Sequence, residues 1–548
     1  MPDSKLSPDD ARRLVQLYDR LATRRIVWDG VWESLAALIR PLRIDVRSRR
    51  ITGATQTQQV FDGTAIKAAS DLASALQGSL SPVDMQFFRL TMRYKPLNDL
   101  MEVKLWLEEC EQRLLLAFQQ SNFEGEVHEM YQDLTVFGTG VMHVQEKDAY
   151  SSQFSGLQFR TVPPGRYVVQ EGPDGHVQKV MRLFQLPIEA ALEIWPEDMS
   201  DTAKRKVEKT PEEPVIILHS MKPSGSGGRR QFVSEYAEYV TKHPLTVDYH
   251  RRLRFLVPRW SKTSEEEYGR GQGHIAFPDV ATLNRAVEMR FKQWAKAIDP
   301  PVLTVDDGVI GKLRLQAGTR TVVRGLDHVA PFETGAKFDV AQFSESELRT
   351  QIRNAFYADK LQLPAKQYMT AYEIQQQVEI MQRELGPTIG RIKNEFLTPL
   401  IDNAFDFMFY AGALPPPPPV LLAAAQVGLS GMAVEYESPL IRAQRTADIV
   451  AVDRTIQSMA PLIQLRPEVM DNYDDDYLAR HIGESAGVPA AAFRDPQAVQ
   501  GIRQSRAEAK QQQIEQQNQL TQSETAKNVG AAAQGLAKAQ PAPPGGGK

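Results

Sequence analysis

The chain has little of what enzymes, disulfide-bonded domains and membrane proteins need. It is 548 residues long with a single cysteine, Cys110, which excludes an internal disulfide framework and a cysteine-based zinc cluster. Cys110 lies in an apolar helical pattern, which predicts a buried and unreactive thiol. Nine histidines are present, but His128 has no second histidine at the spacing of a zinc-binding helix. No Gly-x-Ser-x-Gly motif exists, and no apolar run approaches the ~20 residues that span a bilayer.

The chain also lacks an excess of charge of either sign. Its 64 lysines and arginines stand against 68 aspartates and glutamates, for a net charge of −4. This balance argues against a protein that coats DNA with positive charge, but it leaves room for one that encloses DNA without gripping it. The polar residues 1–10 are unlike a signal peptide, so we expect synthesis in the cytoplasm. We expect no cofactor and no metal site.

Two glycine-rich segments imitate phosphate-binding loops without their spacing. The glycines at 269, 271 and 273 alternate, so the third comes too early for a dinucleotide-binding fingerprint. Residues 308–312 end in Lys312 without the Ser or Thr that follows it in a P-loop. We predict turns at both places. The run Asp474-Asp475-Asp476 is interpreted as the cap of a helix rather than a magnesium site.

Hydrophobic spacing predicts helices in the first part of the chain and strands after them. Ser7 followed by Pro8 is a typical helix start, and we expect this helix to end before Pro41. Further helices are predicted at 64–76, 99–118 and 124–137. Residues 141–257 alternate between polar and apolar side chains, which predicts mainly β-structure with a hairpin turn at 224–228.

A long helix, a compact β-insertion and two more helices are expected next. In residues 277–298 the large apolar side chains recur at steps of three and four, the spacing of one helix face. Residues 299–341 contain short alternating segments. The strands expected there are 302–305, 312–315 and 319–323. Capping boxes predict helix starts at Ser344 and Thr370, the first of these helices ending near residue 357.

The helix that starts at Thr370 is expected to reach residue 410 with a kink. Gly386 and Pro387 lie inside its apolar stripe, and proline removes one helical hydrogen bond without always ending the helix. An isolated Ala- and Gln-rich helix is marginal in water and needs neighbours. The remaining expected elements are a strand at 432–436, such a marginal helix at 495–520 and a disordered tail at 521–548.

Basic residues gather at three places. The first place is near residue 45. Its arginines form either a contact patch for phosphates or an acidic partner, or ordinary surface charge, and the sequence leaves both interpretations open. These arginines are Arg43, Arg47, Arg49 and Arg50. The helix at 277–298 carries Arg285, Arg290, Lys292 and Lys296 off its apolar stripe. The segment between the next two helices is flanked by Lys360 and contains Lys366. Repeated around a closed ring, such residues would form a belt of positive charge.

Several short sequence motifs form a characteristic set through their order along the chain. They are Ser79-Leu80-Ser81-Pro82, Phe87-Phe88-Arg89-Leu90, Leu134-Thr135-Val136-Phe137-Gly138-Thr139-Gly140, Tyr268-Gly269-Arg270-Gly271, Pro278-Asp279, Leu283-Asn284, Asp299-Pro300-Pro301, Thr370-Ala371-Tyr372-Glu373, Leu385-Gly386-Pro387 and Glu395-Phe396-Leu397-Thr398-Pro399-Leu400. In this order the chain resembles the portal proteins, or head-to-tail connectors, of short-tailed, T7-like bacteriophages over roughly residues 10–500. Phe87 and Tyr372 depart from the Trp and Thr expected in relatives.

The resemblance implies an α+β, mainly helical portal fold assembled as a closed ring of twelve subunits around a DNA channel. It implies these parts: wing 1–274, first stem helix 275–298, clip 299–341, second stem helix 342–360, channel loop 361–369, kinked wing helix and strand 370–438, crown 439–494, barrel helix 495–520 and disordered tail 521–548. Basic residues of the stem and channel loop would then approach DNA.

The resemblance also implies partners and a place in the virion. The ring would sit at one capsid vertex, where the genome is packaged and later ejected. Its clip would face the large terminase subunit and then the tail adaptor or nozzle proteins, and the basic clip candidates are Lys312, Arg314, Arg320 and Arg324. The major capsid protein and scaffold would contact the ring, with internal core proteins as a further class, and the ring would nucleate procapsid assembly. The resemblance implies neither an enzyme nor a membrane partner.

Two alternatives belong to other classes. A tail adaptor or collar would also form a ring in the virion, but it predicts a smaller chain without the helix–insertion–helix order. An intracellular enzyme predicts a monomer or small oligomer and a concentrated acid–base site. A chain that slides DNA need not bind it tightly, because each counterion-releasing contact adds affinity and would slow the duplex. The −4 charge fits that role.

Overall fold

In the computed structural model the chain forms two compact units. The first consists of Met1–Arg93, Glu109–Pro417 and Gly431–Ala443, and the second of Tyr94–Glu108, Pro418–Ser430 and Gln444–Lys548. The structure describes residues 6–47, 57–147, 154–224, 232–298, 302–304, 309–310, 322–323, 329–331, 338–358, 385–429, 431–436, 452, 454–461, 466, 473–485, 488, 492–494 and 496–537.

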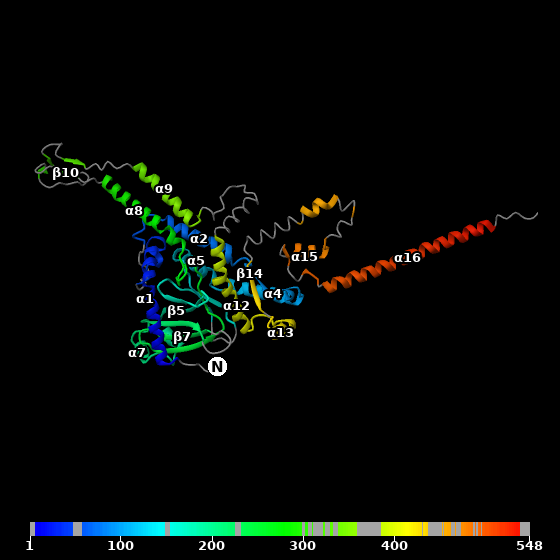
Figure 1. Cartoon of the computed structure of the whole chain (residues 1–548), viewed down its shortest axis with the longest axis horizontal. Helices are drawn as coiled ribbons and strands as arrows, with labels where there is room; N and C mark the ends of the chain where they lie inside the picture. Colours follow the sequence, from blue (N-terminus) through cyan, green and yellow to red (C-terminus); the bar gives the residue numbers. More distant parts are fainter. Residues whose placement is uncertain are drawn as a thin grey trace, which may run out of the picture. The chain divides into compact units, whose positions relative to one another are not determined.

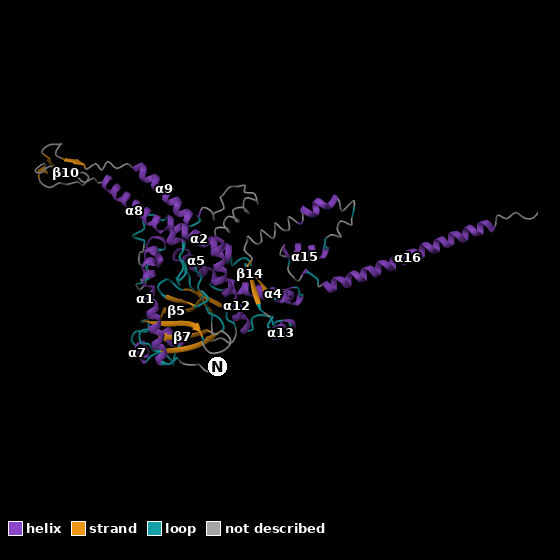
Figure 2. Ribbon diagram, viewed as in Figure 1, coloured by secondary structure: helices purple, strands orange, loops and turns teal. Residues whose placement is uncertain are grey.

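Helices dominate the described residues, and the strands concentrate in the first unit (Figure 2). The helices are α1 Pro8–Ile39, α2 Thr64–Leu80, α3 Lys95–Asn98, α4 Met101–Gln119, α5 Phe123–Phe137, α6 Ile188–Ile194, α7 Asp201–Val207, α8 Gln272–Ile298, α9 Phe338–Ala355, α12 Thr398–Tyr410, α13 Pro419–Gln426, α15 Asp475–Ser485 and α16 Pro496–Ala537. The strands are β1 Phe88–Met92, β2 Met142–Glu146, β3 Leu157–Thr161, β4 Tyr167–Glu171, β5 Val177–Pro187, β6 Pro214–Pro223, β7 Phe232–Glu238, β8 Pro244–His250, β9 Phe255–Leu256, β10 Val302–Thr304, β11 Val309–Ile310, β12 Val322–Val323, β13 Val329–Pro331 and β14 Met432–Tyr436.

An antiparallel five-stranded sheet, in the order β4-β5-β6-β7-β8, lies against helix α1 (Figure 1). Tyr18 and neighbouring apolar residues of α1 pack on Met181, Leu218 and Ala237 of the sheet. Helices α6 and α7 pack through Trp195 in a second apolar cluster that includes Ile217. Alternate residues of a strand face opposite sides, so each sheet face has its own cover.

Several expected elements are confirmed. The Ser7 hydroxyl accepts a hydrogen bond from the Asp10 amide at 3.1 Å and caps α1, and α1 ends at Ile39. The expected hairpin is the antiparallel pair β6–β7, whose turn lies outside the described residues. The strand expected at 432–436 is β14, and it pairs with β1 across more than 300 residues of sequence, from Phe88↔Tyr436 to Met92↔Met432.

Other boundaries differ from those expected. Helix α9 begins at Phe338, before the capping box at Ser344, because no glycine or proline in 338–343 opposes helix formation. Strands β11 and β13 were not expected, and β11 lies at Val309–Ile310, where the predicted turn is therefore wrong. The strand expected at 312–315 lies outside the described residues. The helical segments α6 and α7 also interrupt the region expected to be β.

The second unit contains a long helix whose predicted end is wrong. Helix α16 continues to Ala537, so residues 521–537 are helical where a disordered tail was expected. Alanine, glutamine, glutamate and lysine are good helix formers, and they continue past residue 520. Almost all of its described side chains are exposed, so packing within this chain does not hold the helix.

Candidate functional site at the α8–α9 helix pair

Helices α8 and α9 lie side by side and run in opposite directions (Figure 1). The side-chain amide of Gln272 at the start of α8 reaches the end of α9, where its nitrogen donates to the Ala355 carbonyl at 3.1 Å. Arg290, near the other end of α8, pairs with Glu345 early in α9. The antiparallel pairs β10–β13 and β11–β12 come from the chain between the two helices. The expected order of helix, β-insertion and helix is therefore present.

A chain of ion pairs ties the helix pair to the loop before α2. Glu345 accepts from Arg290 Nη1 at 2.5 Å and lies 3.3 Å from Arg349 Nη2, and Arg349 Nη2 lies 2.9 Å from Asp62. The Glu345 side chain is only 3% exposed. Burial raises the pKa of Asp62, but hydrogen bonds from Thr64 and Arg349 outweigh it, so the net direction is down. Asp62 is thereby kept charged.

Asn284 of α8 binds the same loop through its amide. Its Oδ1 accepts from the backbone amide of Phe61 at 2.7 Å and from that of Asp62 at 3.3 Å, while its Nδ2 donates to the Gln59 carbonyl at 2.9 Å. The phrase Leu283-Asn284 therefore has a physical role: Leu283 is buried, and Asn284 satisfies three backbone groups.

The basic candidates on α8 separate into two groups. At 100° per residue, Arg285, Lys292 and Lys296 fall within about 40° of one another, on the side of α8 opposite its buried residues. Arg285 is exposed, and Lys292 lies 2.6 Å from Glu288. The side chain of Lys296 lies outside the described residues. Arg290 differs, because it binds Glu345 and its guanidinium stacks 5.0 Å from the Trp294 ring centroid.

The remaining candidates are mostly untested. Those outside the described residues are Lys360, Lys366, Lys312, Arg314, Arg320, Arg324, Arg49 and Arg50. Gly386 and Pro387 are helical, but the residues before 385 are not described, so the kink remains a prediction. A π-helical turn at Lys393–Leu397, which the sequence did not predict, interrupts this helix.

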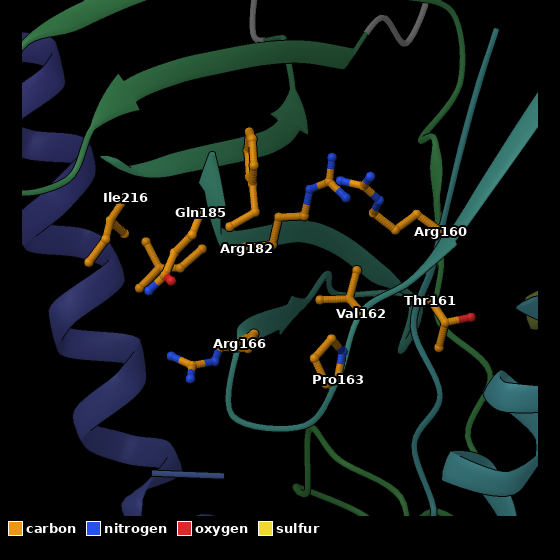
Figure 3. A pocket seen from close by; sticks show the side chains of 10 residues that line it. Arg160, Thr161, Val162, Pro163, Arg166, Arg182, Gln185 and Ile216 are labelled. Carbon is orange, nitrogen blue, oxygen red and sulfur yellow. The ribbon is translucent and has the colours of Figure 1, made fainter. Parts of the chain in front are cut away.

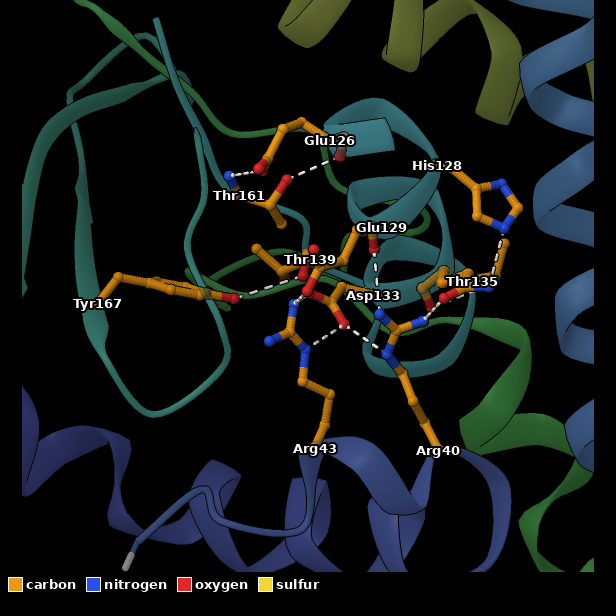
Figure 4. Close-up of polar contacts among 11 residues, drawn as sticks. Arg40, Arg43, Glu126, His128, Glu129, Asp133, Thr135, Thr139, Thr161 and Tyr167 are labelled. Carbon is orange, nitrogen blue, oxygen red and sulfur yellow. Dashed lines mark hydrogen bonds and ion pairs between the residues drawn. The ribbon is translucent and has the colours of Figure 1, made fainter. Parts of the chain in front are cut away.

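The expected basic surface patch is wrong for Arg43. Its side chain is 7% exposed and binds Asp133 at 3.0 Å and also Glu129 (Figure 4). Arg40 reaches the same carboxylate at 2.9 Å. Arg47 is partly exposed and lies 3.5 Å from Glu33. The sequence signal for this buried pair is Asp133, a charged residue between the apolar residues Tyr131 and Leu134 of α5.

The glycine-rich segment 268–274 packs against the segment 134–140, backbone against backbone. A Cβ on Gly271 would lie 2.5 Å from the Thr135 carbonyl oxygen and 2.8 Å from the Gly138 amide. Gly138 ends α5 with φ +79°, a conformation that favours glycine. Residues 268–274 therefore fill the space beside residues 134–140, and the glycines serve close approach rather than a phosphate group.

A buried arginine joins the middle region to the π-helical turn. Arg259 is 1% exposed and donates from Nη2 to Glu395 at 2.5 Å and from its backbone amide to the same carboxylate at 2.9 Å. It also binds Glu171. Burial lowers the pKa of Arg259, but these two glutamates outweigh burial and the net direction is up. The segment that begins at Glu395 therefore takes part in a buried ion pair, which no sequence pattern predicts.

The described residues offer little chemistry. They contain no group of three or more His, Cys, Asp or Glu side chains placed to hold a metal ion. No helix among them has the length and apolarity to cross a bilayer. Burial raises the pKa of the Cys110 thiol to about 12, in line with the unreactive thiol expected. The Asp474 carboxylate accepts from the Asp476 and Tyr477 amides at 3.1 and 3.0 Å, so capping is confirmed.

Comparison with known proteins covers nearly the whole chain. The family described as "Bacteriophage head to tail connecting protein" matches residues 11–493. The "Probable portal protein" of Bordetella phage BPP-1 is 26% identical over 545 residues, covering 93% of both chains. The "Portal protein" of Salmonella phage epsilon15 is 25% identical over 534 residues, covering 92% of this chain and 93% of the relative. A solved structure described as "Neck of empty GTA particle computed with C6 symmetry" aligns with a TM-score of 0.34 at 11% identity, covering 75% of this chain and 94% of that one.

Proposed function

The chain belongs to the family of bacteriophage head to tail connecting proteins, and from that premise we propose that its copies close into a ring whose bore carries the phage genome. The family makes the role structural rather than enzymatic. Both curated relatives, matched over nearly their whole lengths, are portal proteins, which favours a portal over a tail adaptor or collar. We place this portal at one capsid vertex, with twelve subunits in the ring.

The observation that carries the proposal is the antiparallel α8–α9 pair with a β-insertion at its end. The first half of α8 is packed, with Val280, Leu283 and Val287 buried, whereas Phe291 and Trp294 further along are 45% and 40% exposed. Exposed aromatic side chains on one stripe of a helix are costly in a monomer and favour burial against another copy. We therefore assign α8 and α9 to the stem and residues 299–337, between the two helices, to the clip.

The basic face of α8 is proposed to line the bore. Arg285, Lys292 and Lys296 share that face, opposite the buried stripe. In a ring each such residue is repeated once per subunit, which gives a belt of positive charge from a chain of net charge −4. Lys292 is already paired with Glu288, which moderates its attraction for phosphate. A moderate attraction suits a duplex that slides, because each full phosphate contact adds affinity.

The remaining assignments complete the proposal. The clip, with Lys312, Arg314, Arg320 and Arg324, would dock the large terminase subunit during packaging and the tail adaptor or nozzle proteins afterwards. Residues 361–369, with Lys360 and Lys366, would form the channel loop. The major capsid protein and scaffold would contact the wing during procapsid assembly. The C-terminal helix α16, whose side chains are almost all exposed, would gain neighbours from other copies as a helical barrel.

Electron microscopy of the purified full-length protein tests the ring. We expect particles with a central hole and, by light scattering, a mass of about 740 kDa for twelve copies of a 61.5 kDa chain. The double variant Phe291→Ser/Trp294→Ser should weaken ring closure, while Tyr249→Ser, at another exposed aromatic residue, should not. A monomer under all conditions would contradict the proposal.

The basic face is tested separately in a packaging reaction. The double variant Arg285→Gln/Lys292→Gln should change the amount of DNA retained per particle, as should Lys360→Ala/Lys366→Ala. The matched control is Lys67→Gln, which removes an exposed lysine on α2 paired with Asp71. Rings of normal mass that package and retain DNA unchanged in both double variants would remove these residues from the bore while leaving the ring itself intact.

A further inference from the structure

A cavity of about 270 Å³ opens at one edge of the five-stranded sheet, where two arginine side chains meet (Figure 3). Arg182 comes from β5 and Arg160 from β3, and their guanidinium groups lie next to each other in Figure 3. Arg166 also lines the cavity but points away from this pair, toward α1. The rest of the lining is largely apolar and includes Val162 and Ile216.

Arg182 is a buried charge without an acidic partner among the described residues. Its side chain is 5% exposed, its Nε donates to His219 Nδ1 at 3.3 Å, and its guanidinium lies over the rings of Phe184 and Phe255 at 5.0 and 5.3 Å. Among the described residues, the ionisable groups that act on Arg182 are Tyr236 and Arg160, and neither is a carboxylate. Burial, with the charge of Arg160 as a further contribution, lowers the pKa of Arg182 to about 10. Buried arginines are normally paired with an anion, and Arg182 lacks such a partner among the described residues.

The same cavity borders an open strand edge. Strand β4 pairs with β5 only as far as Tyr167↔Arg182, whereas β5 continues to Pro187 against β6 alone. The Leu183 amide donates to the Arg166 carbonyl at 2.8 Å, on the β4 side. The Gln185 amide, two residues on, points to that same side beyond the start of β4, where the described backbone offers it no partner. An open edge of this kind accepts an extended peptide.

We propose that this cavity binds an extended acidic peptide segment of a partner protein, which adds to the β5 edge at Gln185 and places a carboxylate on Arg182 and Arg160. The two guanidinium groups supply charge-assisted hydrogen bonds, and the apolar wall accepts the neighbouring apolar side chain of the peptide. A free phosphate fits less well, because most of the cavity wall offers it no donor. The site lies on the sheet, apart from the α8–α9 pair, and does not depend on the proposed bore.

Binding is tested on the full-length protein with a short fluorescein-labelled peptide in which valine and glutamate alternate, read by fluorescence anisotropy. We expect saturable binding that Arg182→Met, which removes a buried charge, weakens at least about thirtyfold. Arg160→Gln, at an exposed arginine, should weaken it by a smaller factor. Gln185→Pro should also weaken it, because proline removes the edge donor without removing a β5–β6 bond. The matched control Arg205→Gln, an exposed arginine on α7, should bind as the unmodified protein does.

Two further probes separate the sources of the carboxylate. The same peptide with glutamine in place of glutamate should bind weakly, and succinate alone should compete poorly. If succinate displaced the labelled peptide completely and Gln185→Pro had no effect, the proposal of a bound peptide strand would be wrong and the cavity would be a small-anion site. Equal binding of the glutamine peptide, or no saturable binding at low salt, would overturn the proposal. In the absence of ligand, Arg182→Met should raise the melting temperature, because it removes an unpaired buried charge, and a large fall would show that the chain itself satisfies Arg182.

Discussion

Arg290 of α8 donates to the carboxylate of Glu345 of α9 at 2.5 Å, and this contact sets the two antiparallel helices in register. The Glu345 side chain is 3% exposed and that of Arg290 17% exposed, so solvent screens the pair poorly. Arg349 reaches the same carboxylate and continues to Asp62. One glutamate thus compensates two arginines at the point where the helix pair joins the rest of its unit.

The substitution Glu345→Gln should destabilise the protein more than most surface changes do. It keeps the size of the side chain but leaves Arg290 without its carboxylate and Arg349 with Asp62 alone, at a cost of about 3 kcal/mol in the free energy of unfolding. Urea unfolding followed by circular dichroism measures the loss. The control is Glu288→Gln, which breaks the exposed pair with Lys292 and should change little. Equal effects of both variants would show that the buried pair has no special role.

Replacing Gly271 with alanine should disrupt the contact between residues 268–274 and residues 134–140. The new Cβ would meet the carbonyl of Thr135 at 2.5 Å, and a backbone atom cannot move aside as a flexible side chain can. We expect a loss of about 3 kcal/mol, or insoluble protein, by overpacking. Gly78→Ala in α2 is the control, since nothing lies within 4 Å of its Cβ and alanine is the better helix former. Thermal unfolding and soluble yield report both outcomes, and a tolerated Gly271→Ala would contradict the close approach.

Stability should fall as the pH drops below about 6.5, partly because of His250. Burial, with the charge of Arg254, lowers the pKa of His250 to about 3. The folded protein keeps this imidazole neutral, whereas the unfolded chain binds a proton below about pH 6.5. The stability is therefore present above that pH and lost as the pH falls toward 3, by about 2 kcal/mol for this residue between pH 7 and pH 5.

Comparison of variants isolates that contribution. His250→Asn should make urea unfolding less dependent on pH between 7 and 5, whereas His176→Asn, at an exposed histidine, should leave the dependence unchanged. Buried His143 and His219, whose pKa values are also lowered by burial, contribute in the same direction and keep a residual pH dependence in both variants. An unaltered slope in His250→Asn would refute the assignment.

The thiol of Cys110 should react only when the protein opens. It is fully buried in α4, and burial raises its pKa to about 12, so the reactive thiolate is scarce at pH 8. A disulfide reagent should label the native protein slowly, at a rate that follows unfolding, and label the protein at once in guanidinium. Rapid labelling under native conditions would contradict the burial.

Much of the local structure follows from the sequence, because local rules act within a few residues. Ser7 and Pro8 start α1 as expected, and the spacing of apolar residues in 277–298 predicts a helix that the structure confirms as α8. The same rules place α9 too late, since a capping box at Ser344 carries no information about the helix-compatible residues before it. Composition likewise ends α16 too early, at residue 520 rather than Ala537.

The site depends more on long-range pairing. In the sequence Arg43 is a candidate for a basic surface patch. In the structure it forms a buried ion pair with Asp133, ninety residues away. The partners of Arg259 are Glu171 and Glu395, which no sequence spacing connects to it. Arg290 and Arg285 read alike as basic residues of one helix, and only Glu345 on the neighbouring helix distinguishes them.

By itself the sequence determined the absence of disulfide and P-loop chemistry, the helical and β-rich regions, the order of helix, insertion and helix, and the likeness to portal proteins. The tertiary structure decided which charges are free. A charged side chain becomes buried only when a partner from a distant segment compensates it, and that partner is known only once the chain has folded. For the same reason the structure alone revealed Arg182, a buried charge whose partner the described residues do not contain.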